Sequence, residues 1–507
     1  MLFAHKYSNV SKITLVFIMT GMLLAGCTKQ LDIKPEVFIS PEELYKDEAG
    51  VKSGIVGIYR QLLELKRSDY VIVGMVGTDE GKTTLFVPTW GTYWQNFCAV
   101  NTYSTLMTAQ NDVVQGFWID CYKGITNANI AIRSIPGVAI SDATKNQALG
   151  EARFMRALFY FYLVQAYGAV PMPTEEVSTV ADQKGGLPRS SEEDVYKLIV
   201  SDLQFAAANL TAKGGEGNTG RATKEAATGL LGKVYLTRKD WNNAKTTLEP
   251  LLTASNTTLM ANYADLFVEA NENNIESLFE IQFSNENNNT SNLPANLGCW
   301  QINSPELPGA GGHVIIPTDY FFDSFEAGDK RKDATFRTLF FDKDGKPVDY
   351  SWWSDVGKPH IKKFDITKGV SVSSDRSSRN LYYLRLADVI LMYAEAQNEL
   401  GNTAVAMQNL NRIRNRAGLQ NYETAHGTTL TQDQLRKELM LERMRELGFE
   451  GWRWFDLKRT GTLLTEVKAH NIDAAPNITE KHLLYPIPTR EFENNQSLKL
   501  SDQNPGY

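Results

Sequence analysis

Asp79 and Glu80 form an acidic pair that could in principle take part in hydrolysis. Glycoside hydrolysis requires two carboxylates held at a fixed separation across the scissile bond. Adjacent residues on an extended chain, however, point to opposite sides. We therefore expect these two acids to be a poor catalytic pair, which favours a function other than catalysis.

The other motifs do not support metal or cofactor chemistry. The histidines show no HExxH spacing and none stands beside a cysteine or an acid cluster; they are His5, His313, His360, His426, His470 and His482. The Gly309–Gly312 stretch lacks the order of a phosphate-binding loop and predicts a flexible loop. Asp342–Gly345 has too few oxygen ligands for a calcium loop and predicts a tight turn. We expect no metal and no cofactor.

Aromatic side chains outside periodic segments are a stronger chemical signal. One cluster lies in the span 85–103 with Asn96 and Asn101 interleaved, one ring follows an asparagine-rich stretch, and two tryptophans lie in a polar loop. The apolar face of a pyranose stacks on a flat ring, while amides and carboxylates hydrogen-bond to its hydroxyl groups. The candidate glycan-binding residues are Trp90, Tyr93, Trp94, Trp300, Trp352 and Trp353.

The sequence leaves open a purely structural interpretation of these rings. Trp90 and Trp94 are four residues apart and could share one helix face that packs inward. One ring of the adjacent pair at 352–353 is expected to face water. The Gly451–Arg459 segment, with two more tryptophans, directly follows a strong helix pattern and predicts packing rather than binding.

Composition indicates a globular protein. The chain has 507 residues, 42% of them hydrophobic and 22% charged, which excludes wholesale disorder. Its net charge of -7 and pI near 5.6 do not favour a nucleic-acid partner. The cysteines are too few for a disulfide scaffold, and we assign no disulfide among them; they are Cys27, Cys98, Cys121 and Cys299.

The first residues predict export. Lys6 and Lys12 precede the apolar run Ile13–Leu24, which is short for a membrane span, and small residues then lead to Cys27. This arrangement resembles the lipobox of bacterial lipoproteins. We expect residues 1–26 to be a signal peptide and Cys27 to be acylated, although an ordinary cleavage nearby would leave a similar pattern. Acyl chains can hold a globular body at a membrane without a spanning helix.

Helical patterns dominate the rest of the chain. Ser40 and Pro41 predict a helix start, and Ser190 with Glu193 has capping-box spacing, as does Thr431 with Gln434. The predicted helices cover residues 151–168, 190–210, 223–238, 241–252, 381–400, 404–416 and 431–449.

Some of these helices pair in a recognisable way. Gly232, Ala244 and Leu248 have the spacing of a tetratricopeptide repeat. Similar sets are Ala394, Gly401, Ala406 and Leu410, and more weakly Ala157 and Tyr160. The small residues let two helices approach closely, and the large ones fill the groove between them. Because the units are not in tandem, they predict a helical scaffold rather than a regular solenoid.

The segment 255–379 differs from the rest because it is rich in Asn, Gly, Ser and Pro and has strand-like runs at 277–283 and 313–316. We expect a mostly α fold with tetratricopeptide-like helix pairs and minor β structure. The predicted organisation is one domain over 27–507, with the helical scaffold mainly in 40–254 and 380–460 and a loop-rich variable portion at about 255–379.

Five segments in this order resemble the SusD/RagB family of Bacteroidetes outer-membrane lipoproteins. The resemblance spans the whole chain and rests on several segments together, since any one could be a generic amphipathic helix. The segments are Cys27 with Leu31-Asp32, EARFMRALFYFYLVQAYG at 151–168, LRLADVILMYAEAQNELG at 384–401 with LNRIRNRAGL at 410–419, RKELMLERMRELGFEGWRWFDLKRTG at 436–461, and LYPIPTREFENNQSLKLSDQNPGY at 484–507.

The resemblance implies a helical scaffold with four tetratricopeptide-like pairs, surface exposure at the outer membrane, and a SusC-like TonB-dependent barrel as partner. It also implies binding of glycans, or of peptides in some branches, without chemical change. The family's binding residues follow no fixed motif, so the six aromatic candidates depend on position and chemistry alone.

We therefore expect a non-enzymatic, lipid-anchored protein of nutrient uptake that captures an oligosaccharide and passes it to the barrel. Two alternatives stay open: a peptide-binding lid of the same transporter class, and an outer-membrane glycosidase. The second would require two carboxylates about 5 to 10 Å apart in a cleft.

Overall fold

The computed structural model describes residues 40–67, 73–84, 87–175, 186–215, 217–284, 286, 289–291, 297, 314–339, 344, 346–347, 359–364, 371–373 and 376–507. The chain divides into a short unit, Met1–Leu44, and a large compact unit, Tyr45–Tyr507. The described part of the short unit forms α2 (Pro41–Leu44), where the Glu43 N–H donates to Ser40 Oγ at 3.2 Å. The predicted helix start at Ser40 is confirmed.

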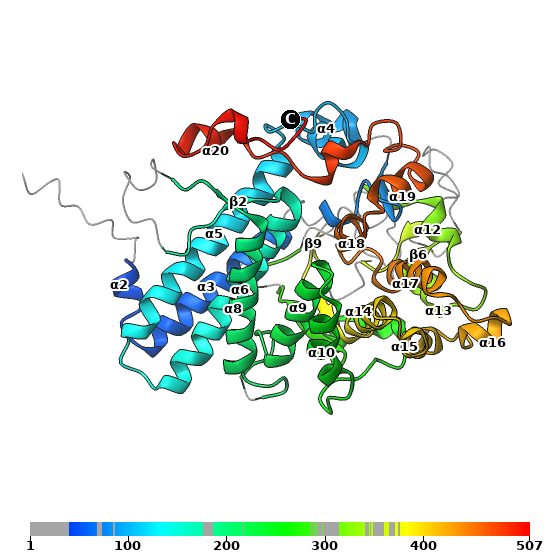
Figure 1. Ribbon diagram of the computed structural model, residues 1–507, viewed down its shortest axis with the longest axis horizontal. Helices are drawn as coiled ribbons and strands as arrows, with labels where there is room; N and C mark the ends of the chain where they lie inside the picture. The colour runs from blue at the N-terminus through cyan, green and yellow to red at the C-terminus, as the bar shows by residue number, and fades with distance from the viewer. Residues whose placement is uncertain are drawn as a thin grey trace, which may run out of the picture. The chain divides into compact units, whose positions relative to one another are not determined.

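The first half of the large unit is a stack of long helices (Figure 1). Each helix packs on the next: α3 (Glu48–Arg67) on α5 (Asp112–Ser134), α5 on α6 (Asp142–Tyr167), α6 on α8 (Glu192–Asn209), α8 on α9 (Lys224–Thr237), and α9 on α10 (Trp241–Leu248). In α6 every residue from Phe154 to Tyr167 is buried, because neighbours cover it on several sides. This helix begins nine residues before the predicted start at Glu151, after the cap Ser141, whose side chain accepts from the Thr144 N–H.

The second half adds further helices, and α14 joins the two halves because it packs against α9, α10, α15 and α17. These helices are α14 (Leu386–Glu399), α15 (Thr403–Arg416), α17 (Gln432–Leu447), α18 (Arg453–Thr460) and α19 (Leu463–His470). Trp452 and Trp454 are buried at the start of α18, which confirms that they pack rather than bind. Among the described helices none is long and apolar enough to cross a membrane.

The close approach predicted at Gly232 is present between α9 and α10. A Cβ added to Gly232 would lie 2.2 Å from Leu248 Cδ2, a distance that no real contact reaches. Ala244 and Leu248 are also fully buried in this pair. The tetratricopeptide-like interpretation of these residues is confirmed.

Short antiparallel strand pairs and brief helices make up much of the described remainder. The strand pairs are β1 (Gly81–Thr83) with β5 (Ile315–Pro317), β2 (Val170–Pro171) with β3 (Arg189–Ser190), β4 (Ser277–Ile281) with β10 (Leu381–Arg385), β6 (Phe336–Arg337) with β7 (His360–Ile361), and β8 (Ser371–Ser373) with β9 (Arg376–Ser377). The brief helices include α12 (Asp319–Asp323), α13 (Lys330–Thr335), α16 (Tyr422–His426) and α20 (Thr489–Asn494). The strand predicted to start at Ser277 is confirmed.

Three predicted helix starts are wrong: that of α6, described above, that of α8, and that of the helix predicted over 381–400. Helix α8 is capped by Ser191, whose side chain accepts from the Asp194 N–H, because Ser190 instead pairs with Val170 in a strand. The first five residues predicted as helix at 381–400 form β10, since this aromatic-rich segment pairs with β4. The bounds of the helix predicted over 241–252 are confirmed, although its last four residues, Glu249–Leu252, form a 3-10 turn that contains a proline.

Buried ion pairs connect residues of the loop-rich portion, 255–379, to the helical scaffold. Arg385 Nη1 on β10 lies 2.8 Å from Glu276 Oε1 and 2.5 Å from Glu446 Oε1 on α17. Arg331 on α13 and Arg416 on α15 also pair with Glu446. Burial alone would raise the pKa of Glu446, but the three guanidinium groups outweigh it and hold that pKa well below its usual range. Each ion is matched by opposite charge, which limits the desolvation cost.

Candidate ligand-binding site

The predicted aromatic cluster at residues 90–94 lies at a break between two helices. The 3-10 helix η3 (Val87–Trp90) ends immediately before Gly91, and α4 (Thr92–Thr102) begins immediately after it. Gly91 has a φ of 121°, which side chains with a β-carbon rarely adopt. Trp90 and Trp94 therefore do not share one helix face, and the i, i+4 arrangement considered above is wrong. The side chain of Trp90 lies outside the described side chains.

The first turn of α4 presents rings to solvent. Tyr93 is 36% exposed, Trp94 is half-buried and Phe97 is buried. The Trp94 ring meets Tyr93 edge-on at a centroid distance of 5.3 Å and Phe97 at 5.5 Å. We call these three residues the α4 ring cluster. Its buried member supports the two accessible rings from below.

The N-terminus of α5 holds α4 in place. The buried Asn111 accepts from the N–H groups of Val113 and Val114 as the cap of α5. Its amide nitrogen donates to Asn96 O on α4 at 2.8 Å and to Leu106 O at 3.1 Å. The amide thus connects two helices and a loop, which holds the backbone of α4 against α5.

Polar groups lie beside the rings. The Asn96 Nδ2 donates to Asp112 Oδ2 at 3.0 Å, and Asp112 is exposed. Asn101, interleaved with the rings in the sequence, is instead buried and accepts from the Gly77 N–H at 3.1 Å, so it supports the fold. The sequence interpretation missed Asn111 and Asp112, although an Asn-Asp pair before an apolar helical stretch is a helix-start signal.

The other candidate residues cannot be placed. Cys27, Trp300, Trp352 and Trp353 lie outside the described residues, as does Cys299. The structure therefore brings together Tyr93 and Trp94, on consecutive positions of α4, with the backbone of Trp90 next to them.

The Asp79–Glu80 pair faces the protein interior. The Asp79 carboxylate forms two bonds with Arg453, at 2.7 and 2.5 Å, and is fully buried. Glu80 is 2% exposed and accepts from the Phe449 N–H at 2.8 Å. Burial raises the pKa of Glu80 to about 8, although that hydrogen bond and the nearby Arg453 oppose the shift. Neither carboxylate can reach a saccharide, in agreement with the sequence interpretation.

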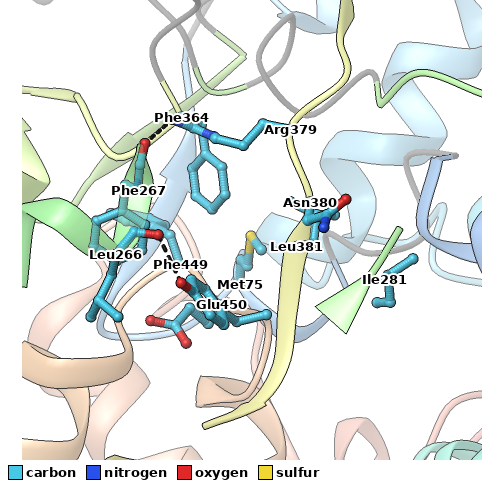
Figure 2. Close-up of a pocket in the computed structure, with 11 residues that line it drawn as sticks. Met75, Leu266, Phe267, Ile281, Phe364, Arg379, Asn380, Leu381, Phe449 and Glu450 are labelled. Atoms are coloured by element: carbon cyan, nitrogen blue, oxygen red, sulfur yellow. Dashed lines mark hydrogen bonds between the residues drawn. The ribbon is translucent and has the colours of Figure 1, made fainter. Parts of the chain in front are cut away.

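A small cavity lies behind β10 (Figure 2). It is lined by Met75, Phe267, Phe364, Arg379 and Phe449 among others and has a volume of about 30 Å³. That space suits a water molecule but not a sugar ring. The Arg379 guanidinium donates to the carbonyl oxygens of Phe267 and Lys363, each at 2.7 Å, rather than to the cavity. We assign no ligand to it.

Across the described residues, no group of three His, Cys, Asp or Glu side chains could hold a metal ion. The described cysteines, Cys98 and Cys121, are buried and form no disulfide.

The helix pairs define a mostly helical protein built on a tetratricopeptide-like scaffold. A model of the SusD family matches residues 341–507, and a model described as starch-binding associating with outer membrane matches residues 78–236. A SusD-like protein from Bacteroides ovatus is 30% identical over 87% of this chain and 81% of its own length. The chain belongs to the SusD family.

Two further relatives match over nearly their whole length. SusD-like protein P25 from Formosa agariphila is 27% identical over 97% of this chain and 99% of its own. A solved structure described as a laminarin-binding SusD-like protein superimposes with a TM-score of 0.78 at 25% identity, covering 91% of this chain and 100% of that one. The family is associated with the outer membrane and with glycan binding, as the resemblance implied.

Proposed function

We propose that this chain captures oligosaccharides at the cell surface and delivers them, chemically unchanged, to a SusC-like TonB-dependent barrel. The observation that carries the proposal is the α4 ring cluster, which presents accessible rings beside Asn96 and Asp112 on a helix held by Asn111. Membership in a family described as starch-binding supports a glycan as the ligand class. The laminarin-binding relative makes a glucan a sensible first probe.

The chemistry of capture is stacking combined with hydrogen bonding. A pyranose face placed on Tyr93 or Trp94 removes apolar surface from water, and the fixed rings lose little conformational freedom on binding. The exposed Asp112 carboxylate can accept bonds from sugar hydroxyls, while Asn96 can accept and donate. We propose that Trp90, Trp300, Trp352 and Trp353 extend this surface.

We propose a lipid anchor at Cys27 that places the protein in the outer membrane and facing outward. The acyl chains would supply membrane affinity of about 0.8 kcal/mol per buried CH2 group. The role proposed for the chain is binding alone, without catalysis, and the energy for import would come from the partner barrel.

A glycan and peptide panel tests the ligand class. Affinity electrophoresis of the chain from residue 28 onward would be run against laminarin, starch and other plant, microbial and host polysaccharides, with a peptide digest measured alongside by calorimetry. We expect saturable binding to one glycan family. Binding of peptides with no response to any glycan would contradict the proposal and assign the protein to peptide uptake.

A further inference from the structure

A groove with a volume of about 770 Å³ runs between α5 and α20, away from the rings of α4. Its lining includes Gln61 from α3, Trp118, Tyr122 and Asn127 from α5, and Arg490 and Asn494 from α20. We call it the α5–α20 groove. Its volume lies within the range of small-molecule binding sites.

The floor of the groove is aromatic and fixed. The rings of Trp118 and Tyr122 lie one helical turn apart with centroids 4.9 Å from each other. Trp118 Nε1 donates to Glu491 Oε2 at 3.3 Å, and the Tyr122 hydroxyl donates to Pro171 O at 2.5 Å. The polar atom of each ring is thus satisfied by the protein. Trp118 is 3% exposed and Tyr122 is half-buried, so Tyr122 supplies most of the accessible ring surface of the floor.

The walls of the groove carry polar side chains that have no partner within the described part of the protein. Within the described part of the chain, the side chains of Gln61, Asn127, Arg490 and Asn494 have no hydrogen-bond or ion-pair partner. Three of these four are uncharged amides, each able to donate and to accept. The cations Lys123 and Arg490 are offset by Glu491 and by Asp120, which pairs with Lys123 at 2.9 Å.

We infer that the α5–α20 groove is a second saccharide-binding site, for a neutral oligosaccharide segment. A ring floor bordered by unused amides matches the apolar faces and the dense hydroxyl groups of a sugar. A strongly acidic ligand would require unbalanced positive charge, which the lining does not offer. Four lining residues are aromatic or apolar and seven are polar, which favours a hydroxyl-rich ligand over the apolar face of a peptide helix.

The two sites are separate positions along one helix. Asp112 begins α5 and contacts Asn96 of α4, whereas the groove lining starts at Trp118 and continues to Asn127. At 1.5 Å per residue, the lining residues of α5 lie between about 9 and about 22 Å from Asp112 along the axis of that helix. This inference takes its ligand class from the proposed function, but it depends on a different set of side chains.

Fluorine NMR can report on each site independently. The full chain, solubilised in detergent and labelled with 5-fluorotryptophan, would be titrated with laminaritriose, maltotriose, cellotriose and xylotriose. The Trp94 and Trp118 resonances would be assigned from Trp94→Phe and Trp118→Phe. We expect both resonances to shift saturably with the same trisaccharide, each with its own dissociation constant.

Surface variants identify the groove as the cause of the Trp118 response. Arg490→Ala with Asn494→Ala should weaken the Trp118 binding curve by about tenfold, because two hydrogen-bonding groups are lost, and leave the Trp94 curve unchanged. The matched control, Lys437→Ala with Asn242→Ala on exposed positions of α17 and α10, should change neither curve.

The outcomes separate the two proposals. A Trp94 response without any Trp118 response would overturn the second site and leave the proposed function standing. A Trp118 response alone would support the groove and remove the ring cluster as a site. Silence of both resonances with all four trisaccharides would contradict both proposals. A Trp118 response that the groove variant leaves unchanged would contradict the second site alone.

Discussion

We expect single rings on α4 to affect glycan binding more than stability. Trp94 is half-buried and rests on Phe97, so Trp94→Ala should remove a stacking surface while leaving the core intact. We expect a loss of about 1 kcal/mol in glycan binding, which is roughly fivefold in Kd, and a small change in Tm. Calorimetry and thermal melts would measure both. Trp241→Ala on α10 is the control; a large drop in Tm for Trp94→Ala would reassign that ring to the core.

Glu80 predicts an unusual pH dependence of stability. Its pKa rises from an ordinary 4.5 to about 8 in the fold, because the charged form loses its water. The folded state therefore binds the proton more tightly than the unfolded state, and this contribution to stability is present below pH 4.5 and lost as pH rises through about 8. Glu80→Gln cannot ionise at this position, so it should lose less stability than the unmodified chain as the pH rises.

Thermal melts at pH 5 and pH 8 test this expectation. The Tm of Glu80→Gln relative to the unmodified chain should increase between the two pH values. The exposed Glu480→Gln should show no such trend. An equal Tm difference for Glu80→Gln at both pH values would mean that Glu80 titrates normally.

The close packing of α9 on α10 can be tested by substituting the glycine at their closest approach. Gly232→Ala would place a methyl group 2.2 Å from Leu248 Cδ2 and force the two helices apart, at a cost of about 1 to 3 kcal/mol. Gly57→Ala on α3 meets no atom within 4 Å and should be neutral or slightly stabilising. Denaturant unfolding would compare them; equal stability of the two variants would contradict the close packing of this repeat-like pair.

Local signals predicted several elements, although the equally local cap of α6 at Ser141 was not used. The Thr431–Gln434 capping box is present on α17, with both reciprocal bonds. The shift from Ser190 to Ser191 and the strand at Leu381–Arg385 were missed because strand pairing with Val170 and with β4 outweighed the helical pattern. Such pairings join distant segments, so a local pattern does not contain them.

For the candidate site, the accessibility of two rings could be predicted from residue type, but their arrangement could not. Tyr93 and Trp94 are accessible, as flat rings among amides suggested. The break at Gly91 and the bond from Asn111 to Asn96 O depend on the path of the chain. The α5–α20 groove is formed by residues of α5 together with residues more than 350 positions later in the chain. Spacing in the sequence could therefore not indicate this groove.

At the scale of the whole molecule, we propose that Cys27 determines where the protein resides. Cys27→Ser should abolish acylation and release the chain from the membrane, because the acyl chains would supply the membrane affinity. Fractionation of cells with sucrose-gradient separation would measure this, with Cys98→Ser as the control for a buried thiol. A Cys27→Ser chain that still fractionates with the outer membrane would refute the lipobox interpretation.

The central claim is that the protein captures a glycan and leaves it unchanged. The most direct measurement incubates the full chain with the glycan selected by the panel and follows both the bound fraction and the chain-length distribution of the glycan. We expect saturable binding with an unaltered chain-length distribution after prolonged incubation. Progressive shortening of the glycan, abolished by a single Asp or Glu substitution, would contradict the central claim and identify a glycosidase.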